Sequence, residues 1–132
     1  MSHSLFTRII AGEIPSYKIY EDELTYAFLA KEQVKEGHTL IVPKVDVDYF
    51  LDVPEPYYAA VFQAAKKVGR AVHKATDCKR VGTAILGWDV PHFHYHLIPM
   101  WGAKDLDFEQ AKELTQERYQ EIQKKIQAHL EE

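Results

Sequence analysis

The chain has 132 residues, of which 46% are hydrophobic, and its formal net charge is -4. This length and composition predict one domain over residues 1–132, with enough apolar material for a core. The acidic balance argues against nucleic-acid binding as the main activity, because contacts with a phosphate backbone need a concentrated basic surface.

The first half of the chain predicts a short helix followed by strands. Apolar residues within 5–10 have the spacing of one helix face. Two aromatic-rich runs, 18–21 and 24–29, flank an acidic turn and predict a strand pair. A third strand is predicted at 38–43, where a proline marks its end.

The second half predicts a long helix that covers a sheet. Within 54–75, large and small apolar residues recur at spacings of three and four and form one continuous stripe. This stripe consists of Tyr58, Val61, Phe62, Ala65, Val68, Gly69 and Val72. A strand at 79–86 follows, then a short helical piece within 108–114. The final helix, 115–130, has only a narrow apolar stripe, so we expect it to pack on the surface.

The most informative stretch is 90–99, where three histidines alternate with apolar residues. In a strand, successive side chains point to opposite faces, so His92, His94 and His96 would line one face and the apolar residues would face a core. We expect this strand to pair with 79–86 as a hairpin. Three imidazoles in register, each able to exchange a proton near neutral pH, indicate a site rather than a core pattern.

A metal site is one interpretation of the three histidines, because open three-histidine zinc sites exist. The outer two would lie ~13 Å apart by strand rise alone, so one metal bound by all three would be strained. We therefore expect no metal and no cofactor. The other interpretation is a nucleophile: a neutral imidazole can attack an electrophilic phosphorus when a neighbour fixes which ring nitrogen keeps its proton.

The motif of 92–98 resembles the signature of the histidine-triad (HIT) family of nucleotide hydrolases and transferases. Residues 6–22 resemble the opening segment of that family, and residues 37–44 resemble its central strand. The resemblance implies an α+β fold in which an antiparallel sheet is covered by a long helix. It also implies a homodimer in which two sheets join into one.

The resemblance assigns roles to residues of this chain. It makes His94 the nucleophile that becomes nucleotidylated, His96 a contact of the phosphate, and His92 the residue that orients them. It places His38 close to the site, and Trp88 and Asp89 beside the leaving group. The residues that it assigns to the nucleotide-base pocket are Leu5, Phe6, Ile9, Phe28 and Leu29.

Several positions depart from the family pattern. Ala30 stands where many members have an aspartate that binds the ribose, and Trp88 replaces a glutamine. Residues 81–82 stand where members have an asparagine that reaches the phosphate. Ser4 and Thr7 replace the Cys-x-x-Cys pair of zinc-containing members, so we expect no structural zinc.

The sequence thus predicts a hydrolase or nucleotidyl transferase that cleaves a nucleoside monophosphate, AMP by resemblance, from a leaving group that stays open. The alternative is a nucleotide-binding or partner-binding protein with little turnover. Cys78 is the only cysteine, so no disulfide can form within the chain, and residues 1–8 lack the apolar run of a secretion signal. We expect a cytoplasmic protein whose partner is a small-molecule nucleotide, without binding to nucleic acid or membrane.

Overall fold

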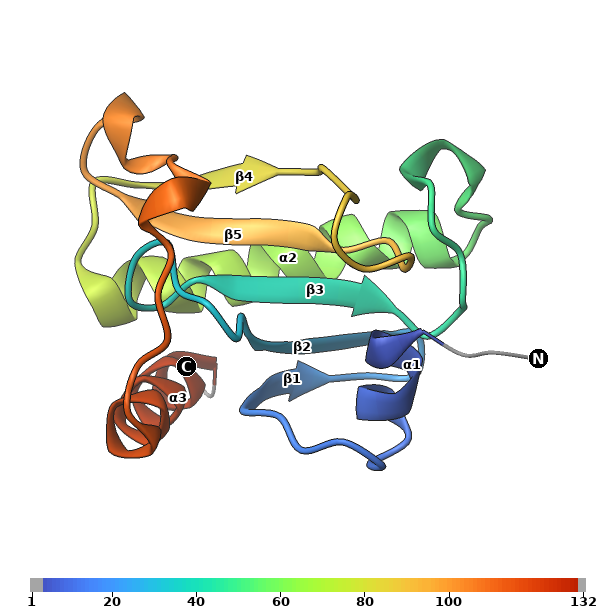
Figure 1. Cartoon of the computed structure of the whole chain (residues 1–132), viewed down its shortest axis with the longest axis horizontal. Helices are drawn as coiled ribbons and strands as arrows, with labels where there is room; N and C mark the ends of the chain where they lie inside the picture. The colour runs from blue at the N-terminus through green and yellow to red at the C-terminus, as the bar shows by residue number, and fades with distance from the viewer. Residues whose placement is uncertain (1–3, 131–132) are drawn as a thin grey trace.

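The computed structural model describes residues 4–130; residues 1–3, part of the stretch expected to carry no secretion signal, and 131–132 lie outside it. Five strands form one antiparallel sheet in the order β1-β2-β3-β5-β4 (Figure 1). The strands are β1 Lys18–Glu21, β2 Thr25–Leu29, β3 Thr39–Pro43, β4 Arg80–Ala84 and β5 Tyr95–Met100. The helices are α1 Leu5–Ile10, α2 Tyr57–Thr76 and α3 Gln116–Leu130, with short 3₁₀ turns at Phe50–Asp52, Ala103–Asp105 and Phe108–Gln110.

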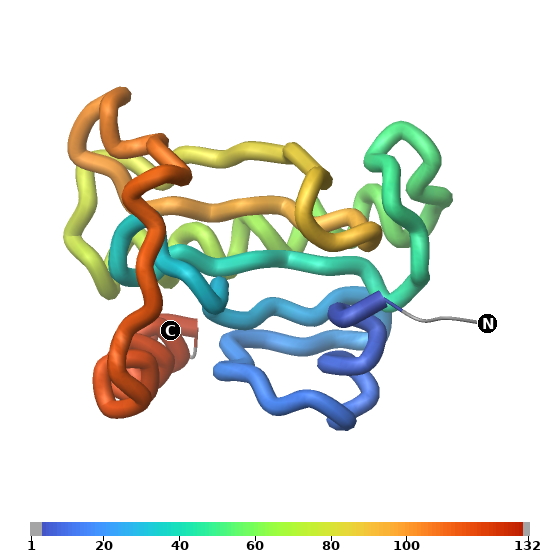
Figure 2. Tube along the Cα trace, viewed as in Figure 1, coloured from blue at the N-terminus to red at the C-terminus, as the bar shows by residue number. Residues whose placement is uncertain are grey.

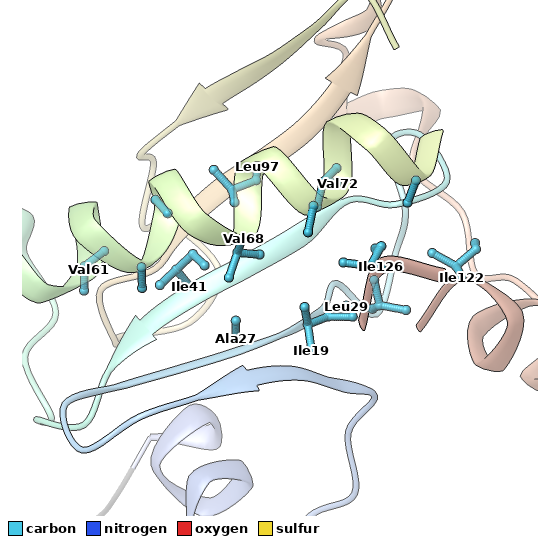
Figure 3. Close-up of a cluster of buried hydrophobic side chains, with 14 of the residues drawn as sticks. Ile19, Ala27, Leu29, Ile41, Val61, Val68, Val72, Leu97, Ile122 and Ile126 are labelled. Atoms are coloured by element: carbon cyan, nitrogen blue, oxygen red, sulfur yellow. The ribbon is translucent and has the colours of Figure 1, made fainter. Parts of the chain in front are cut away.

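The long helix α2 covers one face of the sheet, as predicted. Its buried side chains, among them Val68 and Val72, pack against Ile41 of β3 and Leu97 of β5 (Figure 3). Each such aliphatic side chain removed from water stabilises the fold by about 1.5–3 kcal/mol. The α+β architecture with a helix-covered antiparallel sheet is therefore confirmed.

The other face of the sheet is only partly covered. Helix α1 lies over it at one end, and after β5 the chain crosses the same face before it reaches α3 (Figures 1 and 2). Phe108, in that crossing segment, packs edge-on against the rings of His38 and His96. Every residue of β2 and β3 is buried, because these strands are covered on both faces. No helix within residues 4–130 is long and apolar enough to span a membrane.

Helix α3 differs from the surface element that its narrow stripe predicted. Tyr119, Ile122 and Ile126 are buried in the main core, where the two isoleucines lie beside Leu29 and α2 (Figure 3). The ring of Tyr119 also stacks on Tyr17 at 4.7 Å between centroids. A narrow stripe suffices for core packing here because α3 fills the corner between α2 and the edge of the sheet.

The strand that carries the histidines is shorter than predicted. Strands β4 and β5 pair in antiparallel fashion as expected, but β5 begins only at Tyr95. Before it, the His92 amide donates to the carbonyl of Val90 (2.8 Å) and the Phe93 amide donates to the carbonyl of Val47 (2.7 Å). The first bond closes a local turn, and the second ties Phe93 to the loop after β3 instead of to β4.

Candidate functional site

The three histidines come together beneath α1, on the face of the sheet away from α2. Their side chains are buried, whereas the alternating Phe93 and Leu97 pack into the core under α2. The ring centroids of His94 and His96 lie 5.0 Å apart. The ring of Phe6, on α1, meets the His94 ring edge-on at 5.0 Å between centroids.

His94 is held with one ring nitrogen bonded and the other free. Its Nδ1 lies 2.7 Å from the carbonyl oxygen of His92. A carbonyl can only accept, so Nδ1 carries the proton and Nε2 presents a lone pair. Nε2 is buried and has no hydrogen-bond partner among residues 4–130. The Asp89 carboxylate lies 3.3 Å from it, but two acceptors form no hydrogen bond unless Nε2 is protonated.

His96 is held in the opposite tautomer. The Val34 amide donates to Nδ1 of His38 at 3.2 Å, so the proton of the His38 ring lies on Nε2. That Nε2 donates to Nδ1 of His96 at 2.9 Å, which leaves Nε2 of His96 as an N–H donor. Burial, and then the neighbouring histidines, lower the pKa of His38 to about 3 and that of His96 to about 4. Both rings are neutral at pH 7, as these bonds require.

His92 is fixed at both ring nitrogens. Its Nε2 donates to the carbonyl oxygen of Pro43 at 2.9 Å, and its Nδ1 accepts from the hydroxyl of Ser4 at 2.7 Å. Burial lowers the pKa of His92, which favours the neutral ring. His92 therefore has no free nitrogen to offer a ligand, and its carbonyl is what holds His94.

A buried apolar cluster adjoins the histidines. Phe6, Ile9 and Phe28, all expected there, share a buried cluster with Tyr26, Ala30, Leu40 and Val42. Tyr26 could have been found from sequence, because it lies two residues before Phe28 on the same face of β2. Ala30 is buried in this cluster, so no carboxylate occupies its position beside the pocket.

Three other assigned residues do not join this pocket. Leu29 follows Phe28 on the strand, so it points to the opposite face and packs with α2 and α3 (Figure 3). Its assignment to the base pocket is wrong. Leu5 is 44% exposed on α1 and lies outside both buried clusters, and Trp88 is 92% exposed on the loop before the histidines. The next residue of this loop, Asp89, places its carboxylate 3.3 Å from Nε2 of His94.

Within residues 4–130, no group of three His, Cys, Asp or Glu side chains has an arrangement that could hold a metal ion. The hydrogen bonds give a reason. Of the six ring nitrogens of His92, His94 and His96, only Nε2 of His94 presents a lone pair that no donor occupies. The arrangement suits one nucleophilic nitrogen beside one N–H donor better than a shared metal.

Comparison with known proteins agrees with this geometry. A family model described as the HIT domain matches residues 11–102. The adenosine 5'-monophosphoramidase HNT1 of Saccharomyces cerevisiae is 32% identical over 86% of this chain and 78% of its own length. The adenylylsulfatase HINT3 of Arabidopsis thaliana is 29% identical over 77% of this chain and 57% of its own. The crystal structure of a Hit-like protein from Bartonella henselae superimposes with a TM-score of 0.85 at 29% identity, covering 96% of this chain and 95% of the other.

The burial of neutral histidines predicts a loss of stability in acid. Unfolded histidine has a pKa of 6.5, whereas His38 and His96 have values of about 3 and about 4 in the folded state. The unfolded chain therefore binds more protons as the pH falls below 6.5, and each histidine should lower the free energy of unfolding by roughly 1–2 kcal/mol between pH 8 and pH 5.

Urea titrations across this pH range measure the effect. The His38→Gln variant should show a shallower pH dependence than the wild type, whereas His73→Gln, at an exposed position of α2, should keep the original slope. A free energy of unfolding that stays level from pH 8 to pH 5 in the wild type would contradict the prediction.

Proposed function

The chain belongs to the HIT, or histidine-triad, family, and on that premise we propose that it cleaves a nucleoside monophosphate, AMP in the first instance, from a leaving group. The observation that carries this proposal is the buried, unpartnered Nε2 of His94, held as a lone pair by the bond from Nδ1 to the carbonyl of His92. The names of two relatives, an adenosine 5'-monophosphoramidase and an adenylylsulfatase, support adenosine nucleotides with different leaving groups.

In the first step of the proposed reaction, Nε2 of His94 attacks the phosphorus. The bond from phosphorus to the leaving group breaks, and its electron pair departs with that group, which then takes up a proton. The new nitrogen–phosphorus bond makes the His94 ring cationic, and the hydrogen bond from Nδ1 to the His92 carbonyl stabilises that charge. Nε2–H of His96 donates to a non-bridging phosphoryl oxygen, a contribution worth about 10²–10³ in kcat for such donors.

In the second step, water or another acceptor attacks the phosphorus of the nucleotidyl-His94 intermediate. The nitrogen–phosphorus bond breaks and its electrons return to Nε2 of His94, which restores the lone pair. With water the product is the nucleoside monophosphate, and with another nucleophile the same intermediate gives transfer. The apolar cluster around Phe6 and Phe28 would hold the base during both steps.

A second candidate, a nucleotide-binding protein with little turnover, is favoured by Asp89 and Ala30. The Asp89 carboxylate lies 3.3 Å from the nucleophilic nitrogen, where it opposes an approaching phosphate, and Ala30 offers no carboxylate to the ribose. Single-turnover assays with the protein in excess over adenylylated compounds, among them an AMP phosphoramidate and an adenylyl sulfate, separate the two functions.

The chemical step predicts a separation of binding from turnover. His94→Asn should abolish turnover and the covalent adduct, while AMP binding stays within about tenfold of the wild type, because the base pocket is untouched. His92→Asn and His96→Asn should slow the reaction without moving the attachment point.

Mass spectrometry of protein quenched under conditions that spare acid-labile adducts locates the label. His73→Asn, at an exposed position of α2, is the control. Label on another residue, or full activity of His94→Asn, would refute the mechanism.

The charge of Asp89 predicts a measurable effect on AMP affinity. Asp89→Asn removes a negative charge close to where the phosphate must sit, so the Kd for AMP should fall by about two- to fivefold at low salt, a modest gain because the carboxylate is exposed. The gain should fade near 1 M salt, where the Debye length is about 3 Å. Asp77→Asn removes the same charge at the end of α2 and should leave the Kd unchanged. Isothermal titration calorimetry measures both, and weaker binding by Asp89→Asn would contradict the assignment.

We propose further that the single domain over residues 1–132 forms a homodimer in the cytoplasm. Strand β4 is the last strand of the sheet and pairs only with β5, so a second copy can pair with its outer edge. A groove of about 540 Å³ lies between α2 and β4 next to that edge. Its wall includes the apolar side chains of Phe62 and Tyr95 and the cationic side chains of Lys66, Arg70, Lys79 and Arg80. Sedimentation velocity at micromolar concentration should give twice the chain mass of 15.3 kDa. A sedimenting species with the mass of one chain would contradict a sheet that is continuous across two copies.

A further inference from the structure

A hydrogen-bonded cluster of Ser4, Thr7 and Asp46 surrounds the outer nitrogen of His92, and neither proposed chemical step uses it. The Asp46 carboxylate accepts from the Ser4 amide at 3.1 Å and from the Thr7 hydroxyl at 3.2 Å. The Thr7 amide donates to the Ser4 oxygen at 3.0 Å. The cluster joins the first turn of α1 to the loop after β3, two segments about forty residues apart in the sequence.

The donors and acceptors of the cluster assign the proton of the Ser4 hydroxyl. Asp46 takes the hydroxyl proton of Thr7, and the Ser4 oxygen already accepts from the Thr7 amide. Of the contacts left to the Ser4 hydroxyl, Nδ1 of His92 at 2.7 Å is shorter than the Thr7 oxygen at 3.2 Å, and Nδ1 accepts because the other nitrogen donates to Pro43. The Thr7 hydroxyl lies 3.3 Å from the same Nδ1, so Ser4 is the nearer of two hydroxyls at this nitrogen. Ser4 is thus the donor that completes the fixation of the His92 ring.

The fixation of His92 reaches the nucleophile through the backbone. Within residues 4–130, the carbonyl of His92 is the only hydrogen-bond partner of Nδ1 of His94, and that bond decides which nitrogen of the neutral His94 ring carries the lone pair. The following residue is held as well, because the Phe93 amide donates to the carbonyl of Val47, next to Asp46. Asp46, which anchors Ser4, and Val47, which holds Phe93, thus lie next to each other in the same loop.

The Ser4, Thr7 and Asp46 cluster is also connected, through α1, to the apolar residues proposed to hold the base. Ser4 is the N-cap of α1, whose Phe6 and Ile9 belong to the apolar cluster. The ring of Phe6 meets the rings of both His92 and His94 edge-on, at 5.9 and 5.0 Å between centroids. Helix α1 therefore contacts both the apolar residues proposed to hold the base and His92, whose carbonyl holds His94.

We propose that Ser4, anchored by Asp46, is a positioning residue that fixes the tautomer and direction of the His94 ring through His92. The catalytic consequence rests on the proposed function of His94, whereas the tautomer of the ring does not. The role is one of geometry: Ser4 touches no reacting atom, and its hydroxyl acts through two successive histidines.

Two measurements on Ser4→Ala test the proposal. The first is nitrogen-15 NMR of the His94 ring without substrate. The wild type should show a protonated Nδ1 and an unprotonated Nε2, and Ser4→Ala should shift both signals toward an average of the two tautomers. The second is steady-state kinetics, in which kcat should fall at least tenfold while KM changes less than threefold, because the nucleophile is misdirected and the base pocket remains.

Matched variants separate positioning from the loss of a helix cap. Ser4→Thr keeps the hydroxyl and should restore the ring signals, with kcat within threefold of the wild type. Thr115→Ala removes the hydroxyl that accepts from the Arg118 amide at the start of α3, and should change neither signals nor kinetics. Asp46→Asn keeps the Ser4 hydroxyl but weakens its anchor, so it should shift the His94 ring signals in the same direction. This variant serves as the test if Ser4→Ala does not fold.

Unchanged His94 signals in Ser4→Ala, or in Asp46→Asn when the first variant is unfolded, overturn the proposal. A fall in kcat without any change of the ring signals overturns it too, because the effect would then not pass through the tautomer. If the wild type turns over no substrate, the proposed function fails, and the NMR comparison still decides the role of Ser4.

Discussion

The site depends on one hydrogen bond, from Nδ1 of His94 to the carbonyl of His92. Because a backbone carbonyl can only accept, this bond places the proton of the neutral His94 ring on Nδ1 and leaves the lone pair on the buried Nε2. Next to it, a chain of donors from the Val34 amide through His38 gives His96 the opposite tautomer, with an N–H at Nε2. Two chemically identical side chains thus become an acceptor and a donor through the protein groups behind them.

This division of roles requires the fold to bring distant segments to one point. The end of β3 supplies the carbonyl of Pro43, the loop after it supplies the carbonyl of Val47, and the N-cap of α1 supplies the Ser4 hydroxyl. Helix α2 contributes from the other face of the sheet, since the apolar residues between the histidines pack beneath it. The alternation of side chains therefore couples core and site: a shift of one residue along 92–97 would turn the histidines toward α2 and turn Phe93 and Leu97 toward the site.

The sequence predicted the sheet, the helix that covers it and the placement of the three histidines on one face. All three follow from the periodicity of side chains along a strand or helix. The same rule should have excluded Leu29, since it and Phe28 are neighbours on one strand and cannot line the same pocket. The resemblance gave His92 the role of orienting its neighbours, but the group of His92 that holds His94 is its backbone carbonyl, which no side-chain pattern reveals. Ser4 lies 88 residues from His92 in the sequence, so their bond depends on tertiary structure.

Burial of the site works in two directions. An environment that lowers the pKa of His38 to about 3 and of His96 to about 4 disfavours the protonated forms of these two rings, which costs stability in acid. The same low polarity strengthens the interaction of an N–H donor with charge that develops on a phosphoryl oxygen. A solvated histidine strand would resist acid better, but water would occupy Nε2 of His94 and weaken both roles. Leaving Nε2 of His94 without a hydrogen bond therefore destabilises the fold locally. The exclusion of water that causes this loss also keeps the nitrogen available to attack a substrate.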